Sequence, residues 1–213
     1  MPGLFIITGA NGAGKSTVGS SYLPKIFQGR YEIFDGDKLF MQKQRELYRN
    51  QKIPLKEARN IATEWIYTLF DSLVTDALEK RRHFIYEGHL PLKENWSTPK
   101  KFKQAGYKLH VIFFGLHDTS LSELRVMDRA KNGGHNVPVY EIERNYYGNL
   151  QMLNAHHKII DDLKVIDTTE STQPVLVTHI KSGKILSALK PLDLPAWFQI
   201  GLPALSKMIV ENH

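Results

Sequence analysis

The 213-residue chain is predicted to adopt an α/β fold, with a parallel sheet flanked by helices. Short apolar runs recur along the sequence, and longer helix-permitting segments such as Pro54–Lys80 separate them. Strands that alternate with helices require crossover connections, which make the sheet parallel. The length corresponds to about 1.4 typical domains. Because no repeat or linker divides the sequence, we expect a single domain over residues 1–213.

Five apolar runs are the predicted strands of this sheet: Leu4–Thr8, Tyr31–Phe34, His83–Tyr86, Leu109–Phe114 and Leu163–Ile166. The first run ends in a glycine-rich turn and is typical of a strand buried on both faces. Further along, Val175–Ile180 and Ile185–Leu189 flank Ser182-Gly183 and predict a hairpin. A final helix is predicted over Pro195–Val210, although Pro203 is unfavourable inside it. The C-terminal hairpin and helix thus occupy about 174–210.

Composition and charge narrow the classes of function. Hydrophobic residues make up 42% and charged residues 23% of the chain, which excludes a disordered or collagen-like protein. Cysteine is absent, so thiol nucleophiles and cysteine–metal sites are excluded, and a cytoplasmic location is expected. No apolar run approaches the ~20 residues of a membrane helix, and no secretory signal is visible. The net charge of +6 suits a nucleotide or nucleic acid, or simply favours solubility.

The segment after the first strand fits the phosphate-loop pattern G-x-x-x-x-G-K-[ST]. Its glycines let backbone N–H groups turn inward, where they and the N-terminus of the following helix, predicted over Ser16–Leu23, can hold a β-phosphate. Lys15 can reach the β- and γ-phosphates, and the Ser16 hydroxyl can ligate Mg²⁺. A plain glycine turn would not need those two side chains. The residues expected to bind the nucleotide are Gly9, Ala10, Asn11, Gly12, Ala13, Gly14, Lys15, Ser16 and Thr17.

Acidic residues follow the next two predicted strands. Ligands of an open parallel sheet bind beyond the carboxyl ends of its strands, so Asp37 is expected to face the phosphate loop. A carboxylate there could accept the proton of an attacking hydroxyl. Glu87 ends the third strand at the same edge and could bind a substrate hydroxyl or help to hold a metal. The alternatives are an ordinary turn at Asp35-Gly36 and a capping role for Glu87; His89 is given no role.

Two further helices are predicted to form a lid over about 120–150. A capping-box pattern at Ser120–Glu123 begins the first helix, which should end at Gly133-Gly134. Pro138 lies near the first turn of the second helix.

Arginines on these helices are expected to face inward from the lid. Arg125 and Arg129 lie four residues apart and therefore share a face, and Arg144 lies early on the second helix. Such side chains could neutralise charge on a transferring phosphoryl group. A solvated basic face is the alternative interpretation.

Together these motifs resemble the zeta-toxin branch of the P-loop kinases. The matching pieces are Gly9–Thr17, Phe34–Asp37, Glu87 and Arg125–Arg144, within about Leu4–Leu153. The run from Arg129 to Pro138 is the most distinctive, because it resembles the Gly-Gly-His-x-Val-Pro signature of the compact predicted ATPases of that family. One departure is that no clear metal-binding aspartate ends the run Val111–Leu116; Asp118 comes two residues later.

The resemblance implies a P-loop kinase that uses ATP and Mg²⁺. Characterised zeta toxins phosphorylate the 3′-hydroxyl of UDP-N-acetylglucosamine, so a UDP-sugar is an expected acceptor and an antitoxin protein an expected partner. By the same resemblance Asp37 is the base, Lys15, Arg129 and Arg144 form the phosphate clamp, and Glu87 is a substrate-side acid. Arg125 is placed with the nucleotide. Neither nucleic acid nor a membrane is an expected partner.

Three functions stay open from the sequence. They are a small-molecule kinase, a polynucleotide or other metabolite kinase, and a nucleotide-dependent interaction module without transfer activity. Asp37 and the paired lid arginines favour the first.

Overall fold

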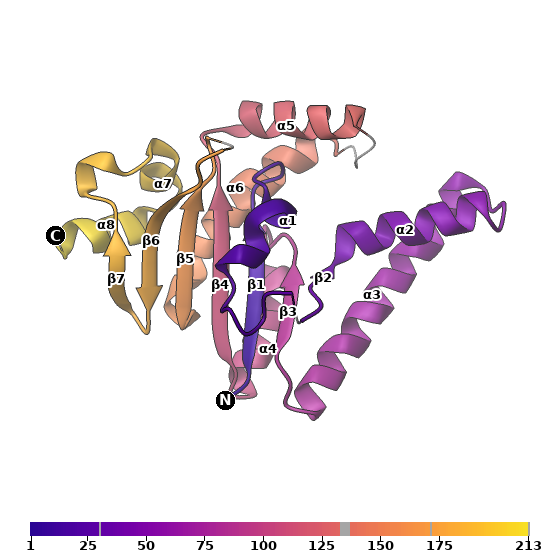
Figure 1. Cartoon of the computed structure of the whole chain (residues 1–213), viewed down its shortest axis with the longest axis horizontal. Coiled ribbons are helices and arrows are strands. Elements are labelled where there is room, and N and C mark those ends of the chain that lie inside the picture. Colours follow the sequence, from indigo (N-terminus) through magenta and orange to yellow (C-terminus); the bar gives the residue numbers. More distant parts are fainter. Residues whose placement is uncertain (30, 133–136, 171, 213) are drawn as a thin grey trace.

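The computed structural model describes residues 1–29, 31–132, 137–170 and 172–212. Within these residues seven strands form one sheet in the order β2-β3-β1-β4-β5-β6-β7. Neighbours from β2 to β5 pair in parallel, and β6 and β7 are added antiparallel beyond β5 (Figure 1). The predicted α/β fold with a mostly parallel sheet and a C-terminal hairpin is therefore confirmed. The strands are β1 (Gly3–Gly9), β2 (Phe34–Asp35), β3 (Phe84–Glu87), β4 (Lys108–Gly115), β5 (Asp162–Asp167), β6 (Val175–Lys181) and β7 (Lys184–Ala188).

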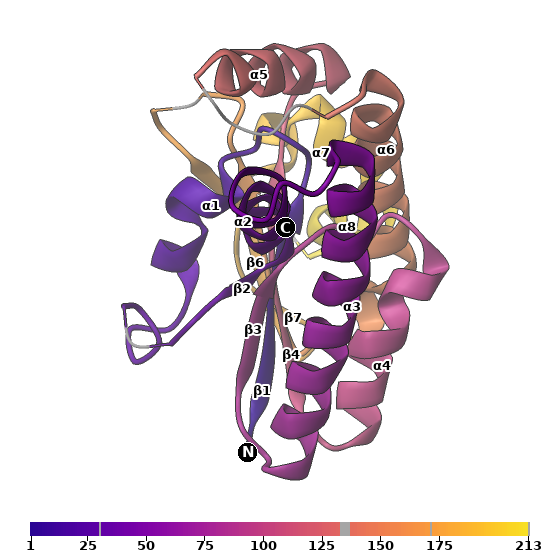
Figure 2. The ribbon, with the colours of Figure 1, turned by 90° about the vertical axis from the view of Figure 1, so that its right-hand side faces the viewer.

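Helices cover both faces of this sheet. Figure 2 shows α1 on one side and α3 and α4 on the other. The α-helices are α1 (Lys15–Val18), α2 (Gly36–Arg49), α3 (Leu55–Glu79), α4 (Ser97–Gln104), α5 (Thr119–Lys131), α6 (Val139–His156), α7 (Ala196–Gly201) and α8 (Pro203–Glu211). Short 3₁₀ helices are η1 (Gly19–Tyr22), η2 (Lys93–Trp96), η3 (His157–Ile159) and η4 (Pro191–Asp193). No helix among the described residues combines the length and apolar content needed to cross a bilayer.

The core lies along the central strands. Every residue of β1 is buried, as expected for a strand covered by helices on both faces. On β3, Phe84 stacks on Phe102 of α4 with ring centroids 6.0 Å apart. At the end of β4, Gly115 lies directly under Trp197 of α7, and a Cβ atom at Gly115 would lie 2.1 Å from that indole ring. Only glycine fits there, so α7 is seated against the end of a central strand.

Two segments of the phosphate-binding half differ from the sequence prediction. Pairing in β2 is limited to Phe34 and Asp35, because this edge strand contacts β3 alone. The helix predicted over Ser16–Leu23 is a single α-turn followed by the 3₁₀ turn η1, which contains the poor helix formers glycine and serine.

Two helix boundaries also differ. The C-terminal helix predicted over Pro195–Val210 is broken at Leu202, since Pro203 lacks an N–H and takes the first position of α8. The capping box predicted at Ser120–Glu123 is wrong: Asp118 caps α5, and its carboxylate accepts a hydrogen bond from the Leu121 amide at 2.8 Å. The predicted helix end at Gly133-Gly134 falls outside the described residues.

The pair α2 and α3 extends away from the sheet beside β2 (Figure 1). The buried residues between the two helices are Leu47, Ala58 and Ala62, and the two alanines let the helices approach closely. Helix α5 lies across the carboxyl ends of the central strands, where it packs on α6 through Val126 and Ile142. The carboxyl edge of the sheet is therefore flanked by α2–α3 on one side and by α5–α6 on the other.

Candidate active site

The phosphate loop connects β1 to α1 at the carboxyl edge. Gly9 has φ of 130°, and a Cβ atom there would lie 2.0 Å from the carbonyl oxygen of Phe114 on β4. Gly14, with φ of 76°, begins α1 in the left-handed region. These two positions require glycine, and they turn the chain from the strand into the helix within five residues. The structure therefore gives the predicted motif the strand–loop–helix setting that phosphate binding needs.

Lys15 lies inside this loop. Its Nζ donates hydrogen bonds to the carbonyl oxygens of Ala10 at 2.8 Å and Gly9 at 3.3 Å, and the residue is buried. Burial lowers the pKa of the Lys15 amine, while the nearby carboxylates of Glu87 and Asp37 oppose that change. The amine thus lies within electrostatic reach of both predicted acids, in the position from which it can turn to a phosphate.

Glu87 lies beside the loop because β3 pairs directly with β1. Ile7 is the register partner of Glu87, and the Ser16 hydroxyl donates a 2.7 Å hydrogen bond to Glu87 Oε1. Burial raises the pKa of Glu87, and both Lys15 and the Ser16 hydrogen bond counteract the rise. A phosphate-loop hydroxyl and a strand-end carboxylate are thereby joined.

These two oxygen donors fit a Mg²⁺ ion. Mg²⁺ usually takes one or two carboxylates and completes its shell with water and substrate phosphates. No group of three or more His, Asp or Glu suited to a metal occurs among the described residues. The sequence analysis found no clear metal-binding aspartate at the end of β4 but named Glu87 as a residue that could help to hold a metal, and the pairing of β3 with β1 brings Glu87 beside the phosphate loop. Asp118 instead serves as the cap of α5.

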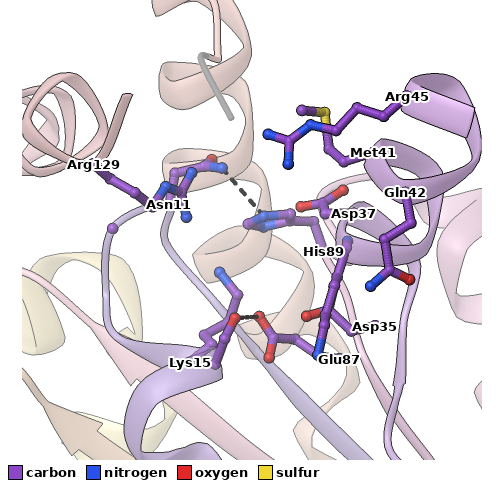
Figure 3. Close-up of a pocket in the computed structure, with 13 residues that line it drawn as sticks. Asn11, Lys15, Asp35, Asp37, Met41, Gln42, Arg45, Glu87, His89 and Arg129 are labelled. Carbon is purple, nitrogen blue, oxygen red and sulfur yellow. Dashed lines mark hydrogen bonds between the residues drawn. The ribbon is translucent and has the colours of Figure 1, made fainter. Parts of the chain in front are cut away.

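Asp37 is held in the first turn of α2. The preceding Asp35 caps that helix, since its carboxylate accepts a 3.0 Å hydrogen bond from the Lys38 amide. The cap fixes where α2 begins and turns Asp37 into a cavity of about 360 Å³ at the phosphate loop (Figure 3). We call this cavity the phosphate cavity; it is also lined by Lys15, Glu87 and Arg129.

The three lid arginines have different surroundings. Arg129 lines the phosphate cavity and contributes to lowering the pKa of Lys15. Arg125 donates to the carbonyl oxygens of Thr168 at 2.8 Å and Thr169 at 2.7 Å, so it ties α5 to the segment after β5. A longer contact of 3.5 Å reaches the Gly12 carbonyl in the phosphate loop.

Arg144 is exposed on α6, and the described residues that line the phosphate cavity do not include it. Its charge still contributes to lowering the pKa of His89. The structure therefore brings Arg129 to the cavity, gives Arg125 a positioning contact, and leaves Arg144 at its margin.

A buried amide network behind the loop was missed by the sequence analysis. Asn145 Nδ2 donates to Asn11 Oδ1 at 2.9 Å. Asn149 accepts from the Leu90 amide at 2.7 Å and donates toward the Gly9 carbonyl at 3.4 Å. Both asparagines belong to the buried stripe of α6, among Ile142, Tyr146, Leu150 and Leu153. The sequence signal for this network was a pair of asparagines four residues apart among the apolar residues of one helix.

His89 is also part of the site, although the sequence analysis gave it no role. Its Nε2 lies 3.3 Å from Asn11 Nδ2 (Figure 3), and its Nδ1 lies 3.3 Å from Asn149 Nδ2. Burial lowers the pKa of His89 well below its ordinary value, and the charges of Lys15, Arg129 and Arg144 lower it further. The ring is therefore neutral at pH 7 and connects the phosphate loop to β3.

A second cavity of about 550 Å³ continues from the phosphate cavity toward α3. We call it the α3 groove; Lys15, Asp35, Asp37, Glu87 and His89 line both cavities. Its outer walls come from α2, α3 and the η2–α4 segment. Asp37 thus lies where the phosphate cavity opens into a space large enough for a small molecule.

Several solved structures have a fold similar to that of this chain. A structure titled AvrRxo1-ORF1:-ORF2 with ATP aligns with a TM-score of 0.67 at 12% identity, covering 98% of this chain and 63% of that chain. The PezAT toxin–antitoxin system of Streptococcus pneumoniae aligns with a TM-score of 0.63 at 19% identity, covering 100% and 87%. A putative kinase from Chloroflexus aurantiacus gives 0.50 at 18% identity, covering 81% and 88%. This chain therefore spans less than two thirds of the chain that it matches in the AvrRxo1-ORF1:-ORF2 structure.

The family assignment comes from the sequence. No curated protein matches the chain. The family model described as Zeta toxin matches residues 1–175, which include the phosphate loop, Asp37, Glu87 and the lid arginines. The chain therefore belongs to the zeta toxin family.

Proposed function

We propose that the protein transfers the γ-phosphoryl group of ATP to a hydroxyl group of a small molecule, with Asp37 as the general base. The observation that carries the proposal is that the Asp37 carboxylate shares one cavity with Lys15, Arg129 and the Ser16–Glu87 pair. A base, a phosphate-binding amine and a metal-side acid are the parts that phosphoryl transfer requires.

The reaction follows from this arrangement. The acceptor hydroxyl lies in the α3 groove beside Asp37, and its oxygen forms a bond to the γ-phosphorus. The bond between that phosphorus and the β–γ bridging oxygen breaks, and ADP leaves. The hydroxyl proton passes to the Asp37 carboxylate. Lys15 and Arg129 balance the negative charge on the phosphoryl oxygens, and Arg144 at the cavity margin adds to this field.

Ser16 and Glu87 would hold Mg²⁺ at the β- and γ-phosphates. When bound, the ion supplies positive charge that offsets the charge developing on the phosphates. The Arg125 contacts to the carbonyls of Thr168 and Thr169 fix α5 over the loop, so Arg125 positions the nucleotide side of the site.

The family resemblance makes a UDP-N-acetyl amino sugar the first acceptor to test. The experiment is ³¹P NMR of the protein with ATP, Mg²⁺ and a set of hydroxyl acceptors that includes UDP-N-acetylglucosamine, compared with Asp37→Asn. We expect a new phosphomonoester signal that requires both an acceptor and Asp37, while the variant binds ATP as the wild type does. Release of free phosphate alone, or transfer that survives in Asp37→Asn, would contradict the base assignment.

A protein partner that restrains the kinase is proposed by analogy with PezAT, which is a toxin–antitoxin system. Expression in bacteria tests whether the chain has an activity that needs restraint. Growth arrest by the wild type but not by Asp37→Asn supports it, and equal growth of the two strains contradicts it.

A further inference from the structure

The α3 groove has an aromatic wall that suits a ring. Phe70 of α3 is its centre, with ring centroids 5.1 Å from Phe34 and 5.5 Å from Tyr86. Tyr67, one turn earlier on α3, also lines the groove and is 67% exposed. Aromatic faces bind flat apolar or sugar-like surfaces and gain little from a phosphate group.

Tyr86 supplies a polar group at the floor of this wall. The residue is only 5% exposed, yet its hydroxyl makes no hydrogen bond to any described residue. Within the described chain, the one fully enclosed polar side-chain atom without a partner is Trp197 Nε1. The Tyr86 hydroxyl therefore opens onto the groove that it lines, and burial keeps it protonated by raising its pKa. A buried donor without a protein partner indicates a ligand that accepts a hydrogen bond there.

The charge of the groove is strongly negative. The described residues that line it include five carboxylates, namely Asp35, Asp37, Asp71, Glu87 and Glu94, and Lys15 is the one charged base among them. Lys15 belongs to the phosphate loop. Neither Asp71 nor Glu94 makes an ion pair or side-chain hydrogen bond within the described part of the chain. An anion in the outer groove would meet uncompensated like charges.

The phosphate cavity next to the groove has the opposite character. Its lining includes Lys38, Arg45 and Arg129 in addition to Lys15. Figure 3 shows Arg45 above Asp37 and Arg129 beside Asn11, at the edge of this cavity. Asp35, Asp37 and Glu87 line both cavities, so the difference comes from the other charged residues. Lys38, Arg45 and Arg129 line the phosphate cavity alone, where the triphosphate of ATP is proposed to lie, and Asp71 and Glu94 line the groove alone, where the acceptor is proposed to lie.

We propose that the acceptor is an amine-bearing hydroxyl compound with a ring face, and that Tyr67, Phe70, Asp71, Tyr86 and Glu94 determine this specificity. The proposal rests on the proposed function, since it names the acceptor of that same site. The ring stacks on Tyr67 and Phe70, the Tyr86 hydroxyl donates to the ligand, and its ammonium group pairs with Asp71 and Glu94. The transferred group, the bonds formed and broken, and the proton acceptor are those given above.

Three probes with one sugar skeleton separate the effect of charge. They are phenyl β-D-glucosaminide, which is cationic, its neutral N-acetyl derivative, and anionic UDP-N-acetylglucosamine. Binding of each to the protein is measured by isothermal titration calorimetry, in the presence of ADP and Mg²⁺. We expect affinity to fall in the order cationic, neutral, anionic.

Variants of groove residues test whether the groove causes this order of affinities. Asp71→Asn and Glu94→Gln should each weaken binding of the cationic probe by up to about five-fold, the range of a single exposed ion pair. The same substitutions should not weaken binding of the neutral probe. Glu79→Gln is the matched control, because Glu79 is an exposed carboxylate on α3, the helix of Asp71, and does not line the groove. Phe70→Leu should weaken both phenyl glycosides.

The outcomes separate the two proposals. Tighter binding of UDP-N-acetylglucosamine than of the cationic probe, failure of the cationic probe to bind, or equal behaviour of Asp71→Asn and Glu79→Gln overturns the acceptor class. Phosphorylation of the probes, followed by ³¹P NMR, reports on the proposed function independently. Transfer to the anionic sugar with the best kcat/KM would overturn the acceptor class and leave the kinase proposal intact.

Discussion

The two sides of the carboxyl edge are built by different means. The phosphate loop is formed by consecutive residues and held by backbone contacts, such as the hydrogen bond from the Ala10 amide to the Phe114 carbonyl at 3.1 Å. The α3 groove is formed by residues from five separate segments, and its acids Asp71 and Glu94 have no partners among the described residues. Binding of the phosphate donor, ATP, thus depends on a local stretch of the chain. The choice of acceptor depends on residues that are far apart in the sequence.

The largest effect is expected from Lys15→Ala, which removes the phosphate-binding amine on the ATP side of the site. Loss of one preorganised charge at a transferring phosphoryl group lowers the rate by about 10²–10³-fold. ATP affinity should also fall, while binding of phenyl β-D-glucosaminide should not weaken. Steady-state kinetics and calorimetry measure the two effects, with the exposed Lys25→Ala as control. If acceptor binding fell as far as ATP binding, the two sides would not be separable.

Glu87→Gln should come next. The amide can still accept the Ser16 hydrogen bond but carries no charge, so the structure is kept while the metal-side acid is lost. We expect the Mg²⁺ concentration for half-maximal activity to rise by at least about tenfold, which is the scale seen when a partner of a metal ligand is removed. An unchanged Mg²⁺ requirement, with a raised KM for the acceptor, would move Glu87 to the acceptor side.

Asn149→Ala should reduce stability, because it leaves the buried Leu90 amide without a partner and opens the network behind the loop. Loss of one buried hydrogen-bond partner costs about 1–3 kcal/mol. Urea denaturation measures the free energy of unfolding. Gln151→Ala is a suitable control, as an exposed polar residue on the same helix. Equal stability of the two variants would show that the network does not support the donor side.

The smallest effect is a pH dependence of stability. Burial, followed by the charge of Lys15, lowers the pKa of His89 in the folded state, whereas the unfolded chain takes up that proton near pH 6.5. The stabilisation is therefore present above about pH 6.5 and is lost as the pH falls, by up to about 1.4 kcal/mol per pH unit.

His89→Gln should flatten this dependence between pH 7.5 and 5.5, as measured by urea denaturation at each pH. His83, whose pKa is also lowered chiefly by burial, contributes in the same direction and is retained in the variant. Parallel curves for the wild type and His89→Gln would contradict a buried neutral His89.

Prediction from sequence succeeded where neighbouring residues determine the structure. The strand–glycine–helix pattern located the phosphate loop, and alternating segments indicated the parallel sheet. It failed where distant elements meet. Ser16 and Glu87 were each predicted at this edge, but the hydrogen bond between them was not, because it depends on β3 pairing with β1. The role of Asn149 was missed because it depends on α6 crossing behind the loop. Tyr67, Asp71 and Glu94 carry no motif at all, since an acceptor groove has no fixed local pattern.

The contact between Gly115 and Trp197 links the two parts of the sequence that the family match divides. Gly115 lies within the matched residues 1–175, and Trp197 lies beyond them. Any larger residue at 115 would collide with the indole, and loss of the indole would leave a hole beside the central strand. The two positions are therefore expected to evolve as a pair, and a chimera that exchanges the C-terminal segment between relatives will fold well only if glycine and tryptophan are exchanged together.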